Sequence, residues 1–527
     1  MSDRSLLVGL TASVAAGLLA YSLHKDKQTH ELPLPPSPQS YPLIGHLLSV
    51  PNEYEHLGFM KLGEQLGSKI FSLTVLGTTI VVLNDKDDAA NLLDKRSTVY
   101  SDRNCPPMVR EPSLFGWGDF GSLVGYGDRW RKYRRLMNPW LTKQAVTVHH
   151  DSQEQATRKL LRRLLDSDQD AMSSHELEAE LFLSVSATLL RAIYGYEAEN
   201  ASDRLLVGAR TVFSYLTKSL LSSNYLVNSL PALMYIPEWF PGAGWKKEKD
   251  ALIQDMYKIG LENMRKDESA HIMVASLRRQ ALQLGLTEME ADDYVGQIAI
   301  TMFAGGTDTT VSTLLMFFMA MVLYPDVQKK AQNEIDSVLG HSRLPKIEDR
   351  DQLSYVDRII QETLRWAPVT PLGELVNIDL KALSLITSAK PAVPHACFQD
   401  DTYNGYHIPK GVIVIGNAWA ITHDETAYAN AEAFNPDRYL DPSTPPSPVF
   451  GWGRRRCPGI HFAQGSLFIT IASILMAFDI GIIKDDNGKN VLPSGKMINA
   501  MVLIPEHFEF KLTPRSASHK ELIKHSS

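Results

Sequence analysis

The sequence predicts a mostly helical single domain with small β-sheets, preceded by a short membrane anchor and a proline-rich linker. The 527 residues are enough for a large core. Beyond about residue 50 the chain shows no second linker and no internal repeat, and long apolar stretches outnumber short β-branched runs. We therefore divide the chain into an anchor at residues 1–24, a linker at residues 25–50 and a main domain at residues 51–527.

The charge balance and the cysteine count exclude several classes of protein. The 53 basic and 60 acidic residues leave a net charge of −7, which gives no general case for nucleic-acid binding. The chain has only 3 cysteines, which are Cys105, Cys397 and Cys457. So few thiols in so long a chain cannot form a disulfide framework, and they favour a reducing compartment.

The N-terminal residues predict an anchor followed by a stiff connector. Residues 5–23 (SLLVGLTASVAAGLLAYSL) carry no charge and are about long enough to cross a bilayer. Lys25 and Lys27 follow, which favours a cytosolic main domain. A cleaved signal peptide is the alternative. The prolines of residues 31–46 prevent a helix and make an extended linker.

Within the main domain, the pattern of residues predicts each element in turn. Residues 70–84 are β-branched around a Gly-Thr-Thr break and predict a hairpin. Residues 291–323 predict a central buried helix that is interrupted at residues 304–310, where two glycines occur. Residues 351–366 predict a helix that Pro368 ends, and residues 403–418 predict strands with turns. The polar residues after Leu512 are expected to be frayed.

The most informative stretch is the loop FGWGRRRCPGIHFAQ at residues 450–464. A cysteine thiolate requires nearby cations, a helix N-terminus or a metal. Arginines precede Cys457, while Pro458 and Gly459 precede an apolar, helix-like run, so the dipole of that helix favours a negative sulfur. Glycines such as Gly451 permit a tight loop to approach a flat ligand. These features make Cys457 a candidate thiolate.

The spacing F-x-x-G-x-R-x-C-x-G is filled by Phe450, Gly453, Arg455, Cys457 and Gly459. It resembles the haem-binding loop of the cytochrome P450 family. The resemblance implies a haem b cofactor, with Cys457 as the axial ligand of the iron and Arg455 paired with a haem propionate. Phe450 and Gly451 would then contact the haem. The bland alternative is a buried, inert cysteine beside a basic turn.

Other segments resemble further motifs of the same family. Residues 304–310 (AGGTDTT) resemble its oxygen-binding segment, which implies that Asp308 and Thr309 are catalytic and deliver protons for cleavage of the O–O bond. A packing contact or a simple kink is the alternative. Trp130 and Arg134 resemble a W-x-x-x-R helix, and His395 resembles an Arg-or-His position, which implies that all three contact a propionate.

A buried ion-pair cluster is also expected. Glu362 and Arg365 share one helix face and have apolar neighbours, as in the family's E-x-x-R helix. Their expected partner is Arg438, and the cluster would support the cysteine loop without taking part in catalysis. A solvated surface pair of little energetic value is the alternative.

One segment departs from the family. Residues 374–392 (ELVNIDLKALSLITSAKPA) separate two flanks that the family joins almost directly. They are either a real insertion that reshapes access of substrate, or a retained intron in the gene sequence, and we favour the intron. Sequencing of the mature transcript distinguishes the two, and a real insertion would make the placement of His395 less secure.

The resemblance implies a monooxygenase that inserts one oxygen atom from O2 into an apolar small molecule, in the manner of fungal microsomal members that act on terpenoids and other secondary metabolites. Electrons would come from NADPH through a membrane-bound cytochrome P450 reductase, which would dock on Lys132, Arg135 and Arg454. The expected location is the endoplasmic reticulum membrane, with the main domain in the cytosol.

Three rival functions remain open. A haem-thiolate isomerase or dehydratase would not use O2, so its turnover would not need NADPH. A non-catalytic haem-binding protein would show no oxygen consumption linked to a substrate. A cysteine nucleophile enzyme needs a histidine base, and His461 is near Cys457 in the sequence, but the loop is rich in arginine and has no acid.

Overall fold

The computed structural model describes residues 32–51, 54–75, 77–103, 105–166, 171–220, 226–228, 243–266, 272–372, 395–498 and 502–526. The predicted anchor at residues 1–24, the first part of the linker and the segment 374–392 lie outside these residues.

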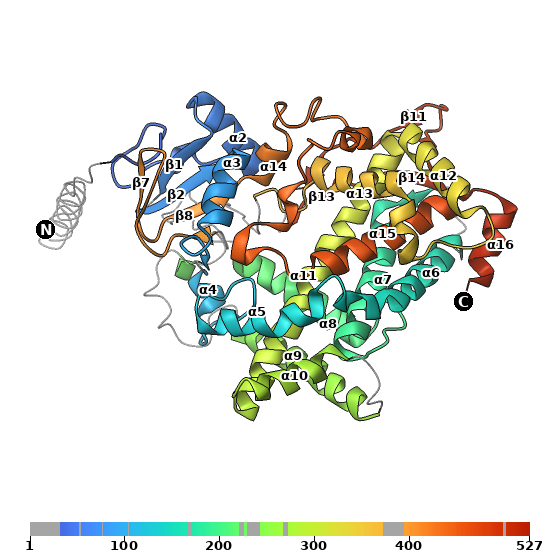
Figure 1. Ribbon diagram of the computed structural model, residues 1–527, viewed down its shortest axis with the longest axis horizontal. Helices are drawn as coiled ribbons and strands as arrows, with labels where there is room; N and C mark the ends of the chain where they lie inside the picture. The colour runs from blue at the N-terminus through green and yellow to red at the C-terminus, as the bar shows by residue number, and fades with distance from the viewer. Residues whose placement is uncertain are drawn as a thin grey trace, which may run out of the picture.

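Helices make up most of the fold, as predicted, and they surround the central helix α11, Glu288–Leu323 (Figure 1). The other helices are α2 Glu55–Gln65, α3 Lys86–Ala89, α4 Pro107–Arg110, α5 Asp128–Leu141, α6 His150–Asp166, α7 Ser174–Tyr194, α8 Arg204–Leu220, α9 Ala243–Lys266, α10 Met273–Gln283, α12 Pro325–Leu339, α13 Ser354–Trp366, α14 Ala418–Thr422, α15 Ile460–Ala477 and α16 Ala517–His525.

Helix α11 confirms the predicted central helix, but it has no interruption at residues 304–310. Thr287 caps its first turn by accepting a hydrogen bond from the Glu290 backbone amide. Gly306 allows close packing on α7, because a Cβ there would lie 2.9 Å from Leu189 Cδ1. Gly306 therefore serves a packing contact of an unbroken helix, and the expected break was wrong.

Two helices in the described part of the chain, α11 and α15, are long and apolar enough to cross a membrane. Within the fold, however, 78% and 72% of their most apolar windows are buried. A helix that is apolar on all sides is typical of the centre of a large protein as well as of a membrane span. The burial identifies both as core helices.

The main sheet lies at one end of the molecule, away from α12 and α16 (Figure 1). Its strand order is β1-β2-β8-β5-β3, formed by β1 Ile70–Val75, β2 Thr78–Leu83, β8 Ile413–Gly416, β5 His395–Ala396 and β3 Asp102–Arg103. The predicted hairpin at residues 70–84 is confirmed by the antiparallel pairing of β1 and β2. Pairing of β3 with β5 places Arg103 opposite His395.

Smaller sheets complete the fold. The first predicted turn of residues 403–418 is confirmed, because Asn404 and Gly405 both have positive φ between β6 Asp401–Tyr403 and β7 Tyr406–Ile408. The remaining strands are β4 Met172–Ser173, β9 Phe478–Gly481, β10 Ile483–Lys484, β11 Asn490–Val491, β12 Met497–Ile498, β13 Ile504–Pro505 and β14 Glu509–Pro514.

The described part of the proline-rich linker packs against the sheet region. The Ser72 hydroxyl donates to the Pro35 carbonyl at 2.7 Å, and the His407 amide donates to the Pro33 carbonyl at 2.8 Å. His46 Nδ1 accepts a hydrogen bond from the Thr74 amide at 2.7 Å. These contacts attach the described linker residues to the main domain.

The predicted ion-pair cluster is present and fully buried at its centre. Glu362 and Arg365 are both 0% exposed, and each Glu362 oxygen accepts a bond from Arg365 at 2.8 Å. Arg438 Nε lies 3.0 Å from both oxygens. Arg365 also donates to the carbonyls of Thr422, Ala431 and Ala433. The buried charges are therefore paired and hydrogen-bonded, which is the condition for tolerating them.

The C-terminal residues are ordered, so the expectation of fraying after Leu512 was wrong. Strand β14 pairs with β9 and β4, and Ser516 caps α16 by accepting from the His519 amide. Ile523 is 0% exposed and His519 is 5% exposed. Packing of a few apolar side chains outweighs the polar composition of this short helix.

Candidate active site

The cysteine loop is a tight turn at the start of α15. The Cys457 amide donates to the Phe450 carbonyl at 2.8 Å, which closes the loop. Gly453 has φ of 52°, and a Cβ there would lie 2.2 Å from the Leu93 carbonyl oxygen, so only glycine fits. Cys457 lies just before the first turn of α15 and is exposed, as the sequence predicts.

The other two cysteines are inert by comparison. Cys105 and Cys397 are both buried. Burial raises the pKa of the Cys105 thiol to about 12 and that of the Cys397 thiol to about 11. Burial disfavours the charged form of a thiol, so neither group is a thiolate at neutral pH. Cys457 is the one exposed thiol of the three.

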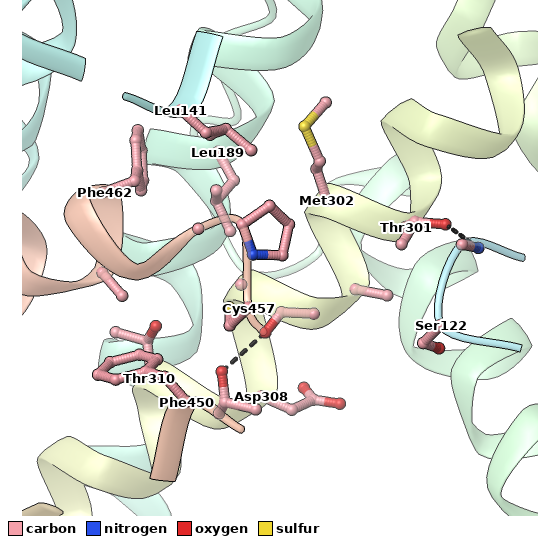
Figure 2. A pocket seen from close by; sticks show the side chains of 18 of the residues that line it. Ser122, Leu141, Leu189, Thr301, Met302, Asp308, Thr310, Phe450, Cys457 and Phe462 are labelled. Carbon is pink, nitrogen blue, oxygen red and sulfur yellow. Dashed lines mark hydrogen bonds between the residues drawn. The ribbon is translucent and has the colours of Figure 1, made fainter. Parts of the chain in front are cut away.

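Cys457 faces a cavity of about 350 Å³ that lies between the cysteine loop and α11. Figure 2 shows Cys457 in this cavity together with Asp308 of α11 and several apolar side chains. The apolar lining comes from several elements that are distant in sequence and includes Phe120, Leu141, Val185, Leu189, Phe213, Leu216, Met302, Val369, Val449, Phe450 and Phe462. Such a lining suits an apolar ligand.

The wall of this largely apolar cavity also contains arginine side chains. Arg103, Arg134 and Arg455 all line it, and Asp308 is the one carboxylate among the described lining residues. Arg455 donates to the carbonyls of Ser101 at 2.8 Å and Val124 at 2.7 Å, and its guanidinium lies 4.8 Å from the ring centre of Trp130. These contacts fix the Arg455 guanidinium in the cavity wall.

Arg134 joins α5 to the cysteine loop, because its Nη1 donates to the Arg456 carbonyl at 3.0 Å. Burial lowers the pKa of the Arg134 guanidinium, and the nearby Cys457 sulfur raises it. Arg134 therefore acts as a cation beside the sulfur. Trp130 lies one helical turn before it and also lines the cavity, and its predicted contact with a propionate stays a prediction.

His395 is placed differently from the other predicted contacts, since it is not among the residues that line the cavity. Its Nδ1 lies 2.5 Å from the Tyr100 carbonyl oxygen, and the residue is 4% exposed. Burial and the guanidiniums of Arg103 and Arg455 hold the pKa of His395 well below its ordinary value. His395 therefore lies near Arg103 and Arg455 but does not itself line the cavity.

The residues present fit haem b. Cations beside an apolar cavity are stabilised only when anions join them, and haem carries two propionates on an otherwise apolar ring. The exposed sulfur of Cys457 lines the same cavity. Gly451 has φ of 73° with open space where a Cβ would be, so the loop leaves room for a flat ligand. A thiolate donor, cations and an apolar wall are the donor set that haem-thiolate proteins require.

Asp308 and Thr309 lie on the α11 side of the cavity. The Thr309 hydroxyl donates to the Gly305 carbonyl at 2.7 Å, which leaves its oxygen lone pairs available as acceptors. Burial raises the pKa of Asp308 to about 6, with Arg210 opposing and Glu178 adding to the rise. A carboxyl group with such a pKa exchanges protons near neutral pH.

A second cavity of about 260 Å³ lies on the other side of Asp308. Its lining includes the charged side chains of Glu178 on α7 and Arg210 on α8, together with Ser214, Thr217 and Ser312. The Glu178 side chain is 42% exposed, and Arg210 is exposed. Asp308 lines both cavities, and the second one combines these polar side chains with apolar ones such as Phe182 and Leu315.

The predicted docking residues separate into two groups. Arg135 and Arg454 are exposed next to the cysteine loop. Lys132 instead pairs with Asp128 at 3.0 Å and lies 6.0 Å from the ring centre of Tyr294 on α11. The ion pair and the ring contact place Lys132 nearer to α11 than the two arginines, and its predicted role in docking stays a prediction.

Sequence reasoning missed some site residues. Arg103 lies in a strand of two residues, which gives no periodic signal. Glu178 and Arg210 reach Asp308 only through the packing of α7 and α8. The walls formed by Phe120, Leu216, Met302 and Val369 come from four separate segments, which only the fold brings together.

Comparisons with known proteins agree with this site. The family model described as Cytochrome P450 matches residues 35–379 and 385–512. Cytochrome P450 monooxygenase claR of Ampulloclitocybe clavipes is 35% identical over 526 residues, which cover 97% of this chain and 92% of the relative. Cytochrome P450 monooxygenase COX2 of Coprinopsis cinerea is 33% identical over 529 residues, covering 98% and 95%. Cytochrome P450 monooxygenase 208 of Postia placenta is 33% identical over 533 residues, covering 99% and 98%.

Proposed function

The chain belongs to the cytochrome P450 family and is a haem-dependent monooxygenase, and on this premise we propose that it hydroxylates or otherwise oxidises an apolar small molecule of fungal secondary metabolism, such as a terpenoid. One observation carries the proposal. A largely apolar cavity contains both the Cys457 sulfur and the acid–alcohol pair Asp308 and Thr309. The fungal origin of the relatives supports the metabolic setting.

Each residue of the cavity has a role in this function. Haem, when bound, supplies the activation of dioxygen and the transfer of one oxygen atom to the substrate. The Cys457 sulfur would hold the haem iron, and Phe450 and Gly451 would leave space for the ring. Arg455, Arg134 and Trp130 would hold the propionates. Arg103 would add positive potential, and the buried ring of His395 packs outside the cavity lining. The apolar side chains bind the substrate and exclude water.

Replacement of Arg455 by methionine is expected to weaken retention of haem at least tenfold, because the charge that pairs with a propionate is lost. The measurement is the rate of haem transfer to excess apomyoglobin. Arg454→Met is the matched control, since Arg454 is exposed and outside the cavity lining. Equal haem loss from both variants would contradict the assignment of Arg455.

The second cavity supports a route for protons. Water at the polar lining of Glu178 and Arg210 can supply protons to Asp308, which lines both cavities. From Asp308 a proton would pass into the apolar cavity, with the Thr309 hydroxyl as acceptor and donor on the way. The pKa of about 6 makes Asp308 an effective carrier at neutral pH.

Asp308→Asn is expected to lower the rate of product formation about 100-fold, which is typical of the loss of a general acid. In the parent enzyme the rate should fall as pH rises above about 6, because the protonated fraction of Asp308 falls. This dependence should vanish in the variant. Asp293→Asn, on the exposed start of the same helix, should retain both the rate and the pH profile. An unchanged pH profile in Asp308→Asn would contradict the carrier role.

Asp308→Asn should also change how the free energy of unfolding depends on pH. The pKa of Asp308 is about 6 in the folded protein and about 3.9 in an unfolded chain. The folded state binds the proton of Asp308 more tightly than the unfolded state does. The contribution of this proton to the free energy of unfolding is therefore complete below about pH 4, and it is lost as the pH rises through about 6. Asp308→Asn should therefore gain up to about 3 kcal/mol of relative stability between pH 4 and pH 7.5. Thermal unfolding at both pH values measures the gain; a constant difference would contradict the raised pKa.

We further propose that electrons come from NADPH through a membrane-bound flavoprotein reductase. Arg131, Arg135, Arg454 and Arg456 are exposed around the cysteine loop and α5. They form a basic surface on the side of Cys457, which suits an acidic partner and gives association that weakens with salt. The uncharged residues 5–23 support a single-pass anchor in the endoplasmic reticulum membrane, with the catalytic domain in the cytosol.

The test of the function is oxygenation by the complete enzyme with its reductase. The full-length chain is co-expressed with a fungal NADPH reductase and supplied with terpenoids under ¹⁸O2. We expect a product that carries one labelled oxygen and appears only with NADPH. Turnover that continues without NADPH or dioxygen would instead identify the isomerase or dehydratase alternative.

A further inference from the structure

Helices α12 and α16 both lie at the end of the molecule away from the main sheet (Figure 1). There, two histidines and an aspartate converge between the C-terminal helix and the end of α12. These residues are Asp336 on α12, His341 just after it and His519 on α16. One ligand atom from each lies within 4.8 Å of the other two. The set of two imidazoles and one carboxylate is a common ligand set for zinc.

His519 is the most buried residue of this cluster, and a hydrogen bond orients its ring. It is 5% exposed, and its Nδ1 lies 2.8 Å from the Ser516 hydroxyl. Ser516 already accepts a bond from the His519 amide and lies 2.7 Å from the Ser518 hydroxyl, so it can accept from Nδ1–H while donating to Ser518. In the tautomer with Nδ1–H, the lone pair of the ring is on Nε2.

Within the described part of the chain, His519 Nε2 is buried and has no hydrogen-bond partner. A buried polar atom without a partner is costly and calls for an explanation, such as a bound ion. Burial also lowers the pKa of His519, with further lowering by Arg515 and His341.

Asp336 is prepared as an ionised ligand. Burial raises its pKa, but hydrogen bonds from Arg515 outweigh this and hold the pKa below its ordinary value. Arg515 contacts both carboxylate oxygens, at 2.9 and 2.6 Å. Each oxygen keeps a second lone pair, so Arg515 can orient the carboxylate in the way that outer partners orient metal ligands.

His341 completes the set from a position that can adjust. Helix α12 ends at Gly340, whose φ is 66°, and the chain then turns so that His341 Nδ1 lies 3.7 Å from Asp336 Oδ1. The His341 side chain is 59% exposed. Ligand atoms around tetrahedral zinc are about 3.3 Å apart, so a modest movement of this exposed side chain would complete the site.

The charges nearest the cluster are those of Arg515, Asp336 and Asp479. Arg515 contributes one positive charge, which Asp336 balances, and Asp479 lies close enough to raise the pKa of His519. We propose that Asp336, His341 and His519 bind one Zn²⁺ ion, with water as the fourth ligand. The ion fastens α16 to the end of α12 and so holds the C-terminal residues on the helical core.

Zinc binding by the haem-loaded protein tests this proposal. The chain is expressed without a histidine tag, treated with EDTA, desalted and titrated with ZnCl2 against a chromophoric chelator. We expect one Zn²⁺ per chain and a higher melting temperature with zinc than without it. His341→Ala should lower zinc affinity at least tenfold and abolish the thermal shift, and the exposed position of His341 makes this variant safe for folding.

Control variants distinguish zinc binding at this site from zinc binding by surface histidines and from effects on the haem. His525→Ala, on the same helix with an 82% exposed side chain, should bind zinc as the parent does. His519→Gln should also lose zinc, and the haem spectrum should stay the same in all variants. Absence of zinc binding in the parent, or equal affinity in parent and His341→Ala, would overturn the proposal. Loss of binding in His507→Ala alone would instead place the ion at the stacked pair His175 and His507.

Discussion

Replacement of Cys457 by serine is expected to reduce oxygenation to the uncatalysed background. A serine hydroxyl is not a thiolate at neutral pH, so it cannot supply the electron density that promotes cleavage of the O–O bond. The arginines and apolar walls of the cavity remain in the variant, so some haem should still bind. Product formation with reductase and NADPH, measured per bound haem, gives the loss.

The matched control for this variant is Cys105→Ala. Cys105 is buried, and burial raises the pKa of its thiol to about 12, so it takes no part in haem chemistry. This variant should retain activity per haem. Activity that survives in Cys457→Ser, or that is lost equally in both variants, would contradict the role of Cys457.

Replacement of Glu362 by glutamine should destabilise the protein by about 3–5 kcal/mol, the range expected when one partner of a buried ion pair is removed. Arg365 and Arg438 would keep their positive charges, at 0% and 6% side-chain exposure, without the carboxylate between them. The cluster ties α13 to the segment that contains Arg438. Thermal unfolding and the yield of haem-loaded protein measure the effect.

Asp437→Asn provides the comparison for Glu362→Gln. Asp437 adjoins Arg438 but forms an exposed pair with Lys330, with side-chain exposures of 40% and 51%. Loss of such a pair should cost less than about 1 kcal/mol. Destabilisation of similar size in both variants would show that burial of the cluster is not what gives Glu362 its importance.

The parts of the site that depend on local sequence were predictable. Loop closure at Cys457 and the tight turn at Gly453 are encoded by residues a few positions apart, and the hairpin at residues 70–84 is encoded in the same way. The Glu362–Arg365 pair lies on one turn of a helix, and apolar neighbours signalled its burial. In each case the sequence spacing determines the geometry.

The parts that depend on tertiary packing were not predictable. Arg103 enters the cavity wall because a two-residue strand pairs with His395, nearly three hundred positions away by the numbering. The break expected in α11 is absent because packing of Gly306 on Leu189 compensates for the low helix propensity of glycine. Helix α16 forms because Ile523 finds a buried site, which its polar neighbours in the sequence do not indicate.

The most direct test of thiolate ligation is the absorption spectrum of the reduced, carbon-monoxide-bound protein. A haem with the Cys457 thiolate as axial ligand is expected to give the strongly red-shifted Soret band of a haem-thiolate protein, and Cys457→Ser should lack that band. A folded, haem-loaded parent protein without the red-shifted band would contradict the assignment of Cys457 and, with it, the proposed oxygenation.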